Sequence, residues 1–462
     1  MVGALGGGLF LRWMAVAGLV IPAGCTMVPP FESPALPVAA QFQGSHAGGE
    51  GGEIGEISWR QFFRDPRLRR ILDLALVNNR DLRVAILNVE ESRARYGIQR
   101  AAGAPVIDAG GSFSRQSSGI STTSQTTASL PNLAYELDLF GRVRSLNSQA
   151  LETYLASGEA RRAAHLALIA EVAAQYFAWC RDHEQILLAR QTLETVGESL
   201  ALTKSLVEAG GTNDLDLRSA EAQLQTARVN LISFERQEKL SANQLVLLMG
   251  QPFPADLPAR PLNPAMVMPV AASGRSSELL LRRPDIMEAE HRLKAANANI
   301  GAARAAFFPS VSLTGSSGAT SSEFNQLFGA STSTWGFSPQ VRVPIFDGGS
   351  NRANLEVARI QRQAEVARYE KAIQSAFREV ADALAAAGSY QGQLAALEAL
   401  AEAQQKRYEL ADARYREGLD AYLNVLSAQQ DLFNARQSLL QTRADSLTNQ
   451  AALYKALGGG WK

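Results

Sequence analysis

The sequence predicts a mainly α-helical chain that also contributes four strands to a membrane β-barrel, which three copies would close with twelve strands and continue as a long α-helical barrel. Two observations predict this fold class. The body of the chain is a tandem duplication, and each copy joins a charge-poor, strand-like stretch to a very long helical pattern. Because about eight strands are the usual minimum for a transmembrane barrel, four strands must close between chains.

The composition excludes several other classes of protein. The 45 Lys and Arg residues balance the 45 Asp and Glu residues among 462, which argues against nucleic-acid binding because phosphates require a basic surface. A mean hydropathy of −0.09 excludes a polytopic helical membrane protein but permits a β-barrel, whose inward side chains are polar. Cys25 and Cys180 are too few for a disulfide scaffold or a four-cysteine zinc site.

The N-terminus has the features of an export signal. Arg12 precedes an apolar stretch, residues 13–21, that is too short to span a bilayer and ends in small residues before Cys25. The ending Ala-Gly-Cys resembles a bacterial lipobox, in which the cysteine is lipidated and becomes the mature N-terminus. We therefore expect residues 1–24 to be removed and Cys25 to carry lipid. The alternative is an ordinary signal with an incidental cysteine.

A tether is predicted after the signal. Residues 25–56 are rich in Pro and Gly and have no apolar period, as expected of an extended, lipid-anchored linker. The residue after the cysteine is Thr26 and not Asp. By resemblance to lipoprotein sorting rules, the lack of Asp at this position favours the outer membrane.

A duplication organises the rest of the chain. It predicts a first repeat at 57–250, a linker at 251–282, a second repeat at 283–458 and a short tail at 459–462. Matched landmarks recur in one order at a nearly constant distance: Asn79-Arg80-Asp81-Leu82 with Arg283-Pro284-Asp285-Ile286, Pro105 with Pro309, Leu139-Phe140-Gly141 with Ile345-Phe346-Asp347, Leu215 to Arg228 with Leu423 to Arg436, and Gly250 with Gly458.

Each repeat contains one stretch that is nearly free of charge. Within 116–135 and 305–341 the only charged residue is Glu323, and Ser, Thr and Gly are abundant. Apolar residues alternate with polar ones at the ends of these stretches: Leu133, Tyr135, Leu137 and Leu139 in the first, and Trp335, Phe337, Val341, Val343 and Ile345 in the second. We predict β-hairpins at 105–141 and 309–347, with strands of about ten residues, long enough to cross a bilayer. A soluble hairpin packed on helices is the alternative, which the duplication in an exported chain disfavours.

Long helices follow both hairpins. Residues 142–208 and 350–417 contain no proline and are dense in Ala, Leu, Glu and Arg. As single helices they would be about 100 Å long, which is typical of coiled coils and helical tubes. After tight glycine turns, residues 215–249 and 423–457 are predicted to return antiparallel to them.

The chain resembles the TolC-like outer-membrane efflux factors, particularly the lipid-anchored NodT-type branch. The motifs that carry the resemblance are Trp59-x-x-Phe62-x-x-Asp65-x-x-Leu68, Asn79-x-Asp81-Leu82, Arg283-Pro284-Asp285, Phe307-Phe308-Pro309, Phe346-Asp347-Gly348-Gly349 and Tyr415-Arg416-Glu417-Gly418-x-x-x-Tyr422-Leu423-x-Val425-Leu426-x-Ala428-Gln429. Together they cover essentially all of the mature chain.

This resemblance implies a homotrimer in the outer membrane of a Gram-negative bacterium, in contact with outer-membrane lipid and extending into the periplasm. An equatorial region would come from residues near 57–78, 251–282 and the C-terminus. A periplasmic adaptor and an inner-membrane pump would dock at the far tip, making a passive gated duct for small toxic compounds or drugs. The alternatives are a duct for type I protein secretion and, in a different class, a pore-less periplasmic adaptor lipoprotein with one coiled-coil hairpin.

The resemblance also implies a gate at the periplasmic turns. The candidate gate residues are Tyr415, Arg416, Asp214, Asp216, Asp420 and Asn424. By the resemblance, Asp216 takes one acidic position of the family, and Asp214 and Asp420 are nearby acids that would supply further charge. Tyr415 takes the position of a locking tyrosine, and threefold symmetry would gather like carboxylates around one axis and favour cations. The second copy departs from the family, with Asn424 and Ser427 at acidic positions. The alternatives are that Asp214 or Asp216 caps a helix starting near Leu215, and that Arg416 is a solvated helix charge.

No catalytic constellation is visible. The four histidines lack metal-ligand spacing, no Gly-x-Ser-x-Gly elbow is present, and Cys180 lies among aromatic residues as a packed side chain does. We therefore expect no enzyme and no cofactor apart from the covalent lipid on Cys25.

Overall fold

A computed structural model describes residues 26–39, 42, 57–254, 256–268, 277–329 and 331–459. The predicted signal peptide, Cys25 and much of the tether lie outside these residues. The chain forms two compact units, one from the described residues of 26–35, 89–157 and 288–369 and the other from those of 36–88, 158–287 and 370–459.

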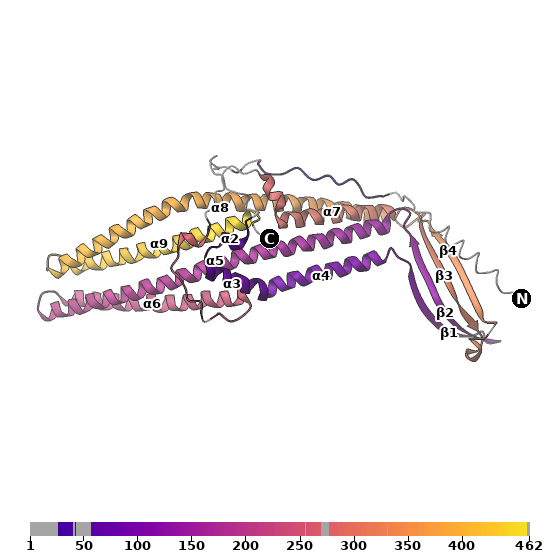
Figure 1. Ribbon diagram of the computed structural model, residues 1–462, viewed down its shortest axis with the longest axis horizontal. Coiled ribbons are helices and arrows are strands. Elements are labelled where there is room, and N and C mark those ends of the chain that lie inside the picture. The colour runs from indigo at the N-terminus through magenta and orange to yellow at the C-terminus, as the bar shows by residue number, and fades with distance from the viewer. Residues whose placement is uncertain are drawn as a thin grey trace. The chain divides into compact units, whose positions relative to one another are not determined.

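The order of elements repeats along the chain (Figure 1). The first repeat contains α2 (Trp59–Phe62), α3 (Pro66–Asn78), α4 (Arg80–Ala101), β1 (Val106–Ser117), β2 (Thr122–Leu137), α5 (Arg142–Glu208) and α6 (Asp214–Met249). Two 3-10 helices, η2 (Pro264–Met266) and η3 (Ser277–Arg282), lead to the second repeat. It contains α7 (Pro284–Ala305), β3 (Ser310–Ser321), the 3-10 helix η4 (Phe324–Gln326), β4 (Ser333–Arg342), α8 (Ser350–Arg416) and α9 (Tyr422–Ala456).

The four strands form one antiparallel sheet in the order β1-β2-β3-β4 within the first unit. Both predicted hairpins are present, and they pair with each other through β2 and β3. The predicted alternation ran too far at the exits of both hairpins: β2 ends at Leu137 and leaves Leu139 beyond the strand, and β4 ends at Arg342 and leaves Val343 and Ile345 beyond it. Pro344 has no N–H with which to extend the hydrogen-bonded ladder.

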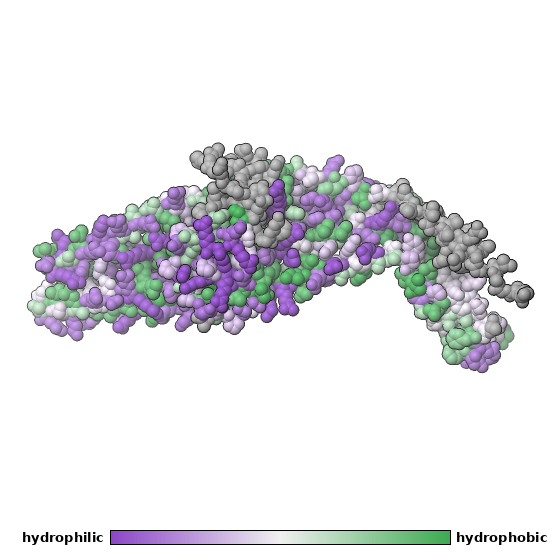
Figure 2. Space-filling view, in the orientation of Figure 1, coloured by the Kyte–Doolittle hydropathy of each residue, from purple (hydrophilic) through white to green (hydrophobic). Residues whose placement is uncertain are grey.

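At the end of the sheet where β2 leads into α5, the register produces one apolar face and one polar face, because residues directly opposite each other on neighbouring strands share a face. The apolar face contains Ile107, Leu133, Tyr135, Leu137, Val311, Leu313, Phe337 and Val341, and the polar face contains Asn132, Glu136, Ser312, Thr314, Ser338, Gln340 and Arg342. Phe337 is 60% exposed and Val341 63% exposed. In Figure 2 white and green residues cover much of the visible sheet, whereas strongly hydrophilic residues crowd the helices. A contiguous exposed apolar surface of this kind marks an interaction with another protein or a membrane.

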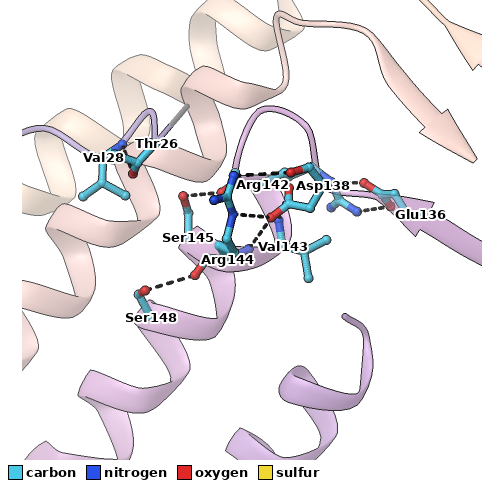
Figure 3. Close-up of polar contacts among 10 residues, drawn as sticks. Thr26, Val28, Glu136, Asp138, Arg142, Val143, Arg144, Ser145 and Ser148 are labelled. Atoms are coloured by element: carbon cyan, nitrogen blue, oxygen red, sulfur yellow. Dashed lines mark hydrogen bonds and ion pairs between the residues drawn. The ribbon is translucent and has the colours of Figure 1, made fainter. Parts of the chain in front are cut away.

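Charged side chains connect β2 to α5 (Figure 3). Arg142 forms a two-pronged bond to Glu136, with N–O distances of 2.9 and 2.6 Å. Asp138 accepts hydrogen bonds from the backbone N–H groups of Val143 at 3.1 Å and Arg144 at 2.8 Å. These are first-turn donors that no helical carbonyl can satisfy. Asp138 therefore fixes the point at which the strand becomes the long helix.

The start of the predicted tether is bound to its own unit. The amide of Asn297 donates to the Pro29 carbonyl at 2.9 Å, and Arg304 donates to the Met27 carbonyl at 3.3 Å. Both side chains come from α7. Between them lies Gly301, where a Cβ would lie 2.5 Å from Cγ2 of Val28, so only glycine leaves room for the segment. Residues 26–35 contain no helix or strand, and residues 27–29 lie against α7.

In the second unit the long helices turn back on their return helices, as predicted (Figure 1). One hydrophobic core joins α2, α3, the middle of α5, the end of α6, the segment around η2 and the end of α9; its largest members include Phe62, Phe63, Leu68, Ile71, Tyr176, Phe177, Leu245 and Tyr454. Helix α5 has an 18-residue stretch apolar enough to cross a membrane by length and composition, but half of it is buried inside the protein. Its residues Leu168 to Cys180 contribute to this core, which accounts for their apolar character.

Arg283 ties three helices of the second unit together. Its guanidinium, only 4% exposed, binds Asp285 at 2.7 Å, Glu379 of α8 at 2.8 Å and the Ala456 carbonyl of α9 at 2.8 Å. Two carboxylates and a carbonyl thus share one buried guanidinium.

We expect Arg283→Met to destabilise the protein by about 2–3 kcal/mol, because it leaves the Ala456 carbonyl without its donor and removes the cation that Asp285 and Glu379 share. Arg283→Lys should cost less, since it keeps the charge and loses only the planar fork. Thermal unfolding followed by circular dichroism in detergent checks both, and equal midpoints for the parent and the Met variant would contradict the role.

Candidate gate at the helical turns

The turn between α5 and α6 is closed by backbone hydrogen bonds. Gly210 has a φ of 73°, a left-handed conformation that glycine adopts without strain. The N–H of Gly210 donates to the Val207 carbonyl at 3.0 Å and that of Gly211 to the Leu206 carbonyl at 2.8 Å. This pair of bonds is a Schellman motif, which satisfies carbonyls left open at the end of α5.

The turn between α8 and α9 repeats this geometry. Gly418 has a φ of 69°, and the N–H groups of Gly418 and Leu419 donate to the carbonyls of Tyr415 and Arg414, each at 2.9 Å. The duplication is therefore conserved down to single hydrogen bonds, although the side chains of the two turns differ.

The acidic residues of the first turn lie at the start of α6. The N-cap is Asn213, whose side-chain oxygen accepts from the Asp216 N–H at 3.0 Å. The alternative that Asp214 or Asp216 caps this helix was wrong, because α6 starts at Asp214 and both aspartates lie inside its first turn. Asp216 accepts a hydrogen bond from Thr212. Asp214 is exposed and lies 3.6 Å from Arg218.

Asp420 is the acid around which the second turn is built. It accepts hydrogen bonds from the Asn424 amide, the Ala421 N–H at 2.9 Å and the Arg414 guanidinium at 3.3 Å. The bonds from Asn424 and then Ala421 hold the pKa of Asp420 below its ordinary value. Its charge is therefore secure at neutral pH. Asn424, a departure from the acidic pattern, supports the neighbouring carboxylate.

Tyr415 belongs to a buried cluster in which the helix pair α5–α6 meets the helix pair α8–α9. It is 4% exposed, its ring centroid lies 5.3 Å from that of Tyr422, and Val425 and Ala220 complete the cluster. Its hydroxyl lies 3.2 Å from the Thr203 hydroxyl of α5. Tyr415 therefore joins the end of α8 to both α5 and α9.

Arg416 is held on its own helix by Asp412 at 2.8 Å, so the structure places it as a helix-surface charge. Among the described residues, no hydrogen bond or ion pair joins Tyr415 or Arg416 to Asp214, Asp216 or Asp420.

Sequence reasoning missed Thr203 and Arg414. Neither stands out in the sequence, because both look like ordinary polar positions of long helices. The side chains gathered here are suited to holding the turns together and to presenting negative charge. In the part of the chain that the structure describes, no group of three His, Cys, Asp or Glu side chains is arranged to bind a metal ion.

Comparisons with known proteins match this architecture over almost the whole chain. A model of the outer membrane efflux protein family matches residues 71–251 and 276–459. Two Pseudomonas putida proteins, the toluene efflux pump outer membrane protein TtgC and the antibiotic efflux pump outer membrane protein ArpC, are each 47% identical over 463 residues, covering 97% of this chain and 95% of theirs.

A solved structure shares the fold. The MtrE outer membrane channel of Neisseria gonorrhoeae, crystallised in its open state, superposes with a TM-score of 0.87 and 41% identity, covering 95% of this chain and 99% of that one.

Proposed function

The chain belongs to the outer membrane efflux protein family and is an outer-membrane channel component of an efflux pump, and from this premise we propose that three copies form one gated duct in a tripartite pump. Its partners are a periplasmic adaptor and an inner-membrane pump. The family and the duplicated hairpins leave no role for the pore-less adaptor alternative.

The sheet is the observation that carries this proposal. Its four strands leave β1 and β4 at the edges, without a neighbouring strand among the described residues. Unpaired edges invite another chain, and a bilayer requires every backbone donor and acceptor to be satisfied. Pairing β1 of one copy with β4 of the next around a threefold axis closes a twelve-stranded barrel. The apolar face then meets lipid and the polar face lines the duct.

The N-terminal segment supports the proposed lipid anchor. Arg304, which holds the Met27 carbonyl, lies near the end of α7 and just before β3. A lipid on Cys25 would therefore emerge beside the base of the sheet, where it reaches outer-membrane lipid.

The turns form the periplasmic gate. Threefold symmetry brings three copies of Asp216 and Asp420 around the axis, and rings of carboxylates favour cations. We assign the negative charge to Asp214, Asp216 and Asp420. Asn424 and Arg414 hold Asp420 in place, and Tyr415 connects the helix pair α8–α9 to α5. Arg416 contributes charge on the outside of its helix. The same end of the duct meets the adaptor and pump.

The cargo is small toxic compounds. The names of TtgC and ArpC give toluene and antibiotics as the compounds exported by those pumps. Passage through a water-filled duct requires no catalytic step, so we assign this chain transport and no enzymatic activity.

The mature protein purified in detergent should be a trimer and should form small, cation-preferring channels in planar bilayers. Mass measurement of the protein–detergent complex and single-channel recording check the two parts separately. A monomer that extracts without detergent and never conducts would refute the duct. A trimer whose channels prefer anions would remove only the carboxylate gate.

A further inference from the structure

A stripe of polar side chains runs through the contact between α5, α8 and α9 in the second unit. Helix α5 contributes hydroxyls at helical spacing, α8 contributes tyrosines seven residues apart, and α9 contributes a tyrosine and a glutamine seven residues apart: Thr192, Thr195, Ser199 and Thr203; Tyr408 and Tyr415; Tyr422 and Gln429. Such spacings keep residues on one helix face. The bond between Tyr415 and Thr203 shows that these faces meet.

A pocket of about 90 Å³ lies at the end of this stripe that is farther from the helical turns. Its polar lining comes from all three helices and includes Thr192, Thr195, Gln405, Tyr408 and Gln429. Most of these groups already have partners. Thr192 donates to the Leu188 carbonyl at 2.8 Å, Thr195 to the Gln191 carbonyl at 3.0 Å, and Gln405 accepts from Arg436 at 2.6 Å.

Gln429 differs from these three residues. Its side chain lines the pocket and is only 4% exposed, yet neither its amide nitrogen nor its amide oxygen hydrogen-bonds to any residue the structure describes. A buried primary amide without partners costs free energy, since it has lost its hydrogen bonds to bulk water. Native proteins satisfy such groups with protein atoms or ordered water.

We propose that this pocket is a water-binding site in which ordered waters connect Gln429 to α5 and α8. About 10–15 Å³ accommodates one water, so the volume is sufficient for several. Waters can accept from Nε2 of Gln429 and donate to its Oε1, and the Thr192 and Thr195 hydroxyls retain lone pairs for a second bond because their hydrogens point to backbone carbonyls. Burial raises the pKa of Tyr408 to about 12, so its hydroxyl remains a donor at neutral pH.

At this site, water-mediated hydrogen bonds connect α9 to α5 and α8. Water-mediated bonds are nearly as favourable as direct ones and can re-form after a small displacement, whereas interdigitated apolar side chains allow fewer alternative positions. The packing of α9 against α5 and α8 next to the Tyr415 cluster can therefore shift slightly without the loss of hydrogen bonds. The water site itself does not depend on the proposed duct, because it lies within one chain.

A structure of the purified full-length mature protein, at a resolution that places waters, tests the proposal directly. Ordered solvent should lie within hydrogen-bond distance of both amide atoms of Gln429 and should be absent in Gln429→Leu. A pocket without ordered solvent, or an amide bonded directly to neighbouring side chains, would overturn the water site.

Thermal unfolding provides the second measurement. If water satisfies the amide, Gln429→Leu should change the midpoint by no more than about one degree, because the leucine replaces a satisfied group and leaves no protein partner unpaired. A rise of several degrees would mean a dry, unpaired amide, and a fall of several degrees would mean an amide bonded to protein; either overturns the proposal. Gln430→Leu is the matched control, since Gln430 bonds to Asn434 on its own helix and does not line the pocket.

Discussion

Gly250→Ala is expected to prevent the chain from accumulating as folded protein in the outer membrane. Gly250 ends α6 with a φ of 67°, and a Cβ there would lie 2.3 Å from the backbone oxygen of Asn78 and 2.8 Å from its carbonyl carbon. Backbone at the end of α3 must move to relieve this overlap, and the left-handed conformation adds strain of its own. The combined cost should exceed about 3 kcal/mol.

The duplication provides the matched control. Gly458 is the counterpart of Gly250 and also has a positive φ, 73°, but a Cβ there would lie 3.4 Å from the side-chain Cγ of Arg283 and 3.8 Å from the nearest backbone atom. Gly458→Ala should therefore cost only the conformational strain, about 1 kcal/mol. Immunoblots of outer-membrane fractions and thermal midpoints compare the two variants. Equal losses would show that the approach of Gly250 to Asn78 is unimportant.

Tyr415→Ala is expected to raise single-channel conductance severalfold. Removing this buried side chain takes away packing against Tyr422 and the bond to Thr203, and truncation of a buried aromatic residue costs about 3–5 kcal/mol. Since Tyr415 joins the end of α8 to α5, its loss should loosen the closed turns. Recording in planar bilayers measures the change directly.

Two further variants separate the contributions. Tyr415→Phe keeps the ring and loses only the hydroxyl, so its conductance should rise much less than that of Tyr415→Ala. Asp216→Ala should also raise conductance and weaken cation preference, because it removes a charge close to the proposed axis. Unchanged conductance in both alanine variants would remove Tyr415 and Asp216 from the gate.

Particular elements show why much of this fold could be predicted from one sequence. The proline-free runs of α5 and α8 and the charge-poor hairpins are local patterns, and local patterns report secondary structure directly. The duplication then provided two copies of each element to compare, so that the turn at Gly210 was supported by the matching turn at Gly418. The exits from β2 and β4 were both predicted too late, because the alternation of side chains continues past Leu137 and Arg342, where the strands end.

The candidate gate was predictable only as a region. Its position follows from the glycine turns, but the roles of its side chains depend on neighbours far away in the sequence. Tyr415 meets Thr203 on another helix. The alternative in which Asp214 or Asp216 caps the helix failed because Asn213, which is equally suited to that role, is the N-cap and the helix starts at Asp214.

The sequence by itself determined the element order, the duplication, the membrane-length strands and the family, because each is a property of periodicity or of motif order along the chain. Only the tertiary structure decided that residues 26–35 lie along α7, that Arg283 joins three helices, and that Gln429 is buried beside a pocket without a hydrogen-bond partner among the described residues. The physical reason is that burial and hydrogen bonding are pairwise properties. A polar residue in a long helix reads the same in sequence whether it faces water or another helix, and only the packing of distant segments distinguishes the two.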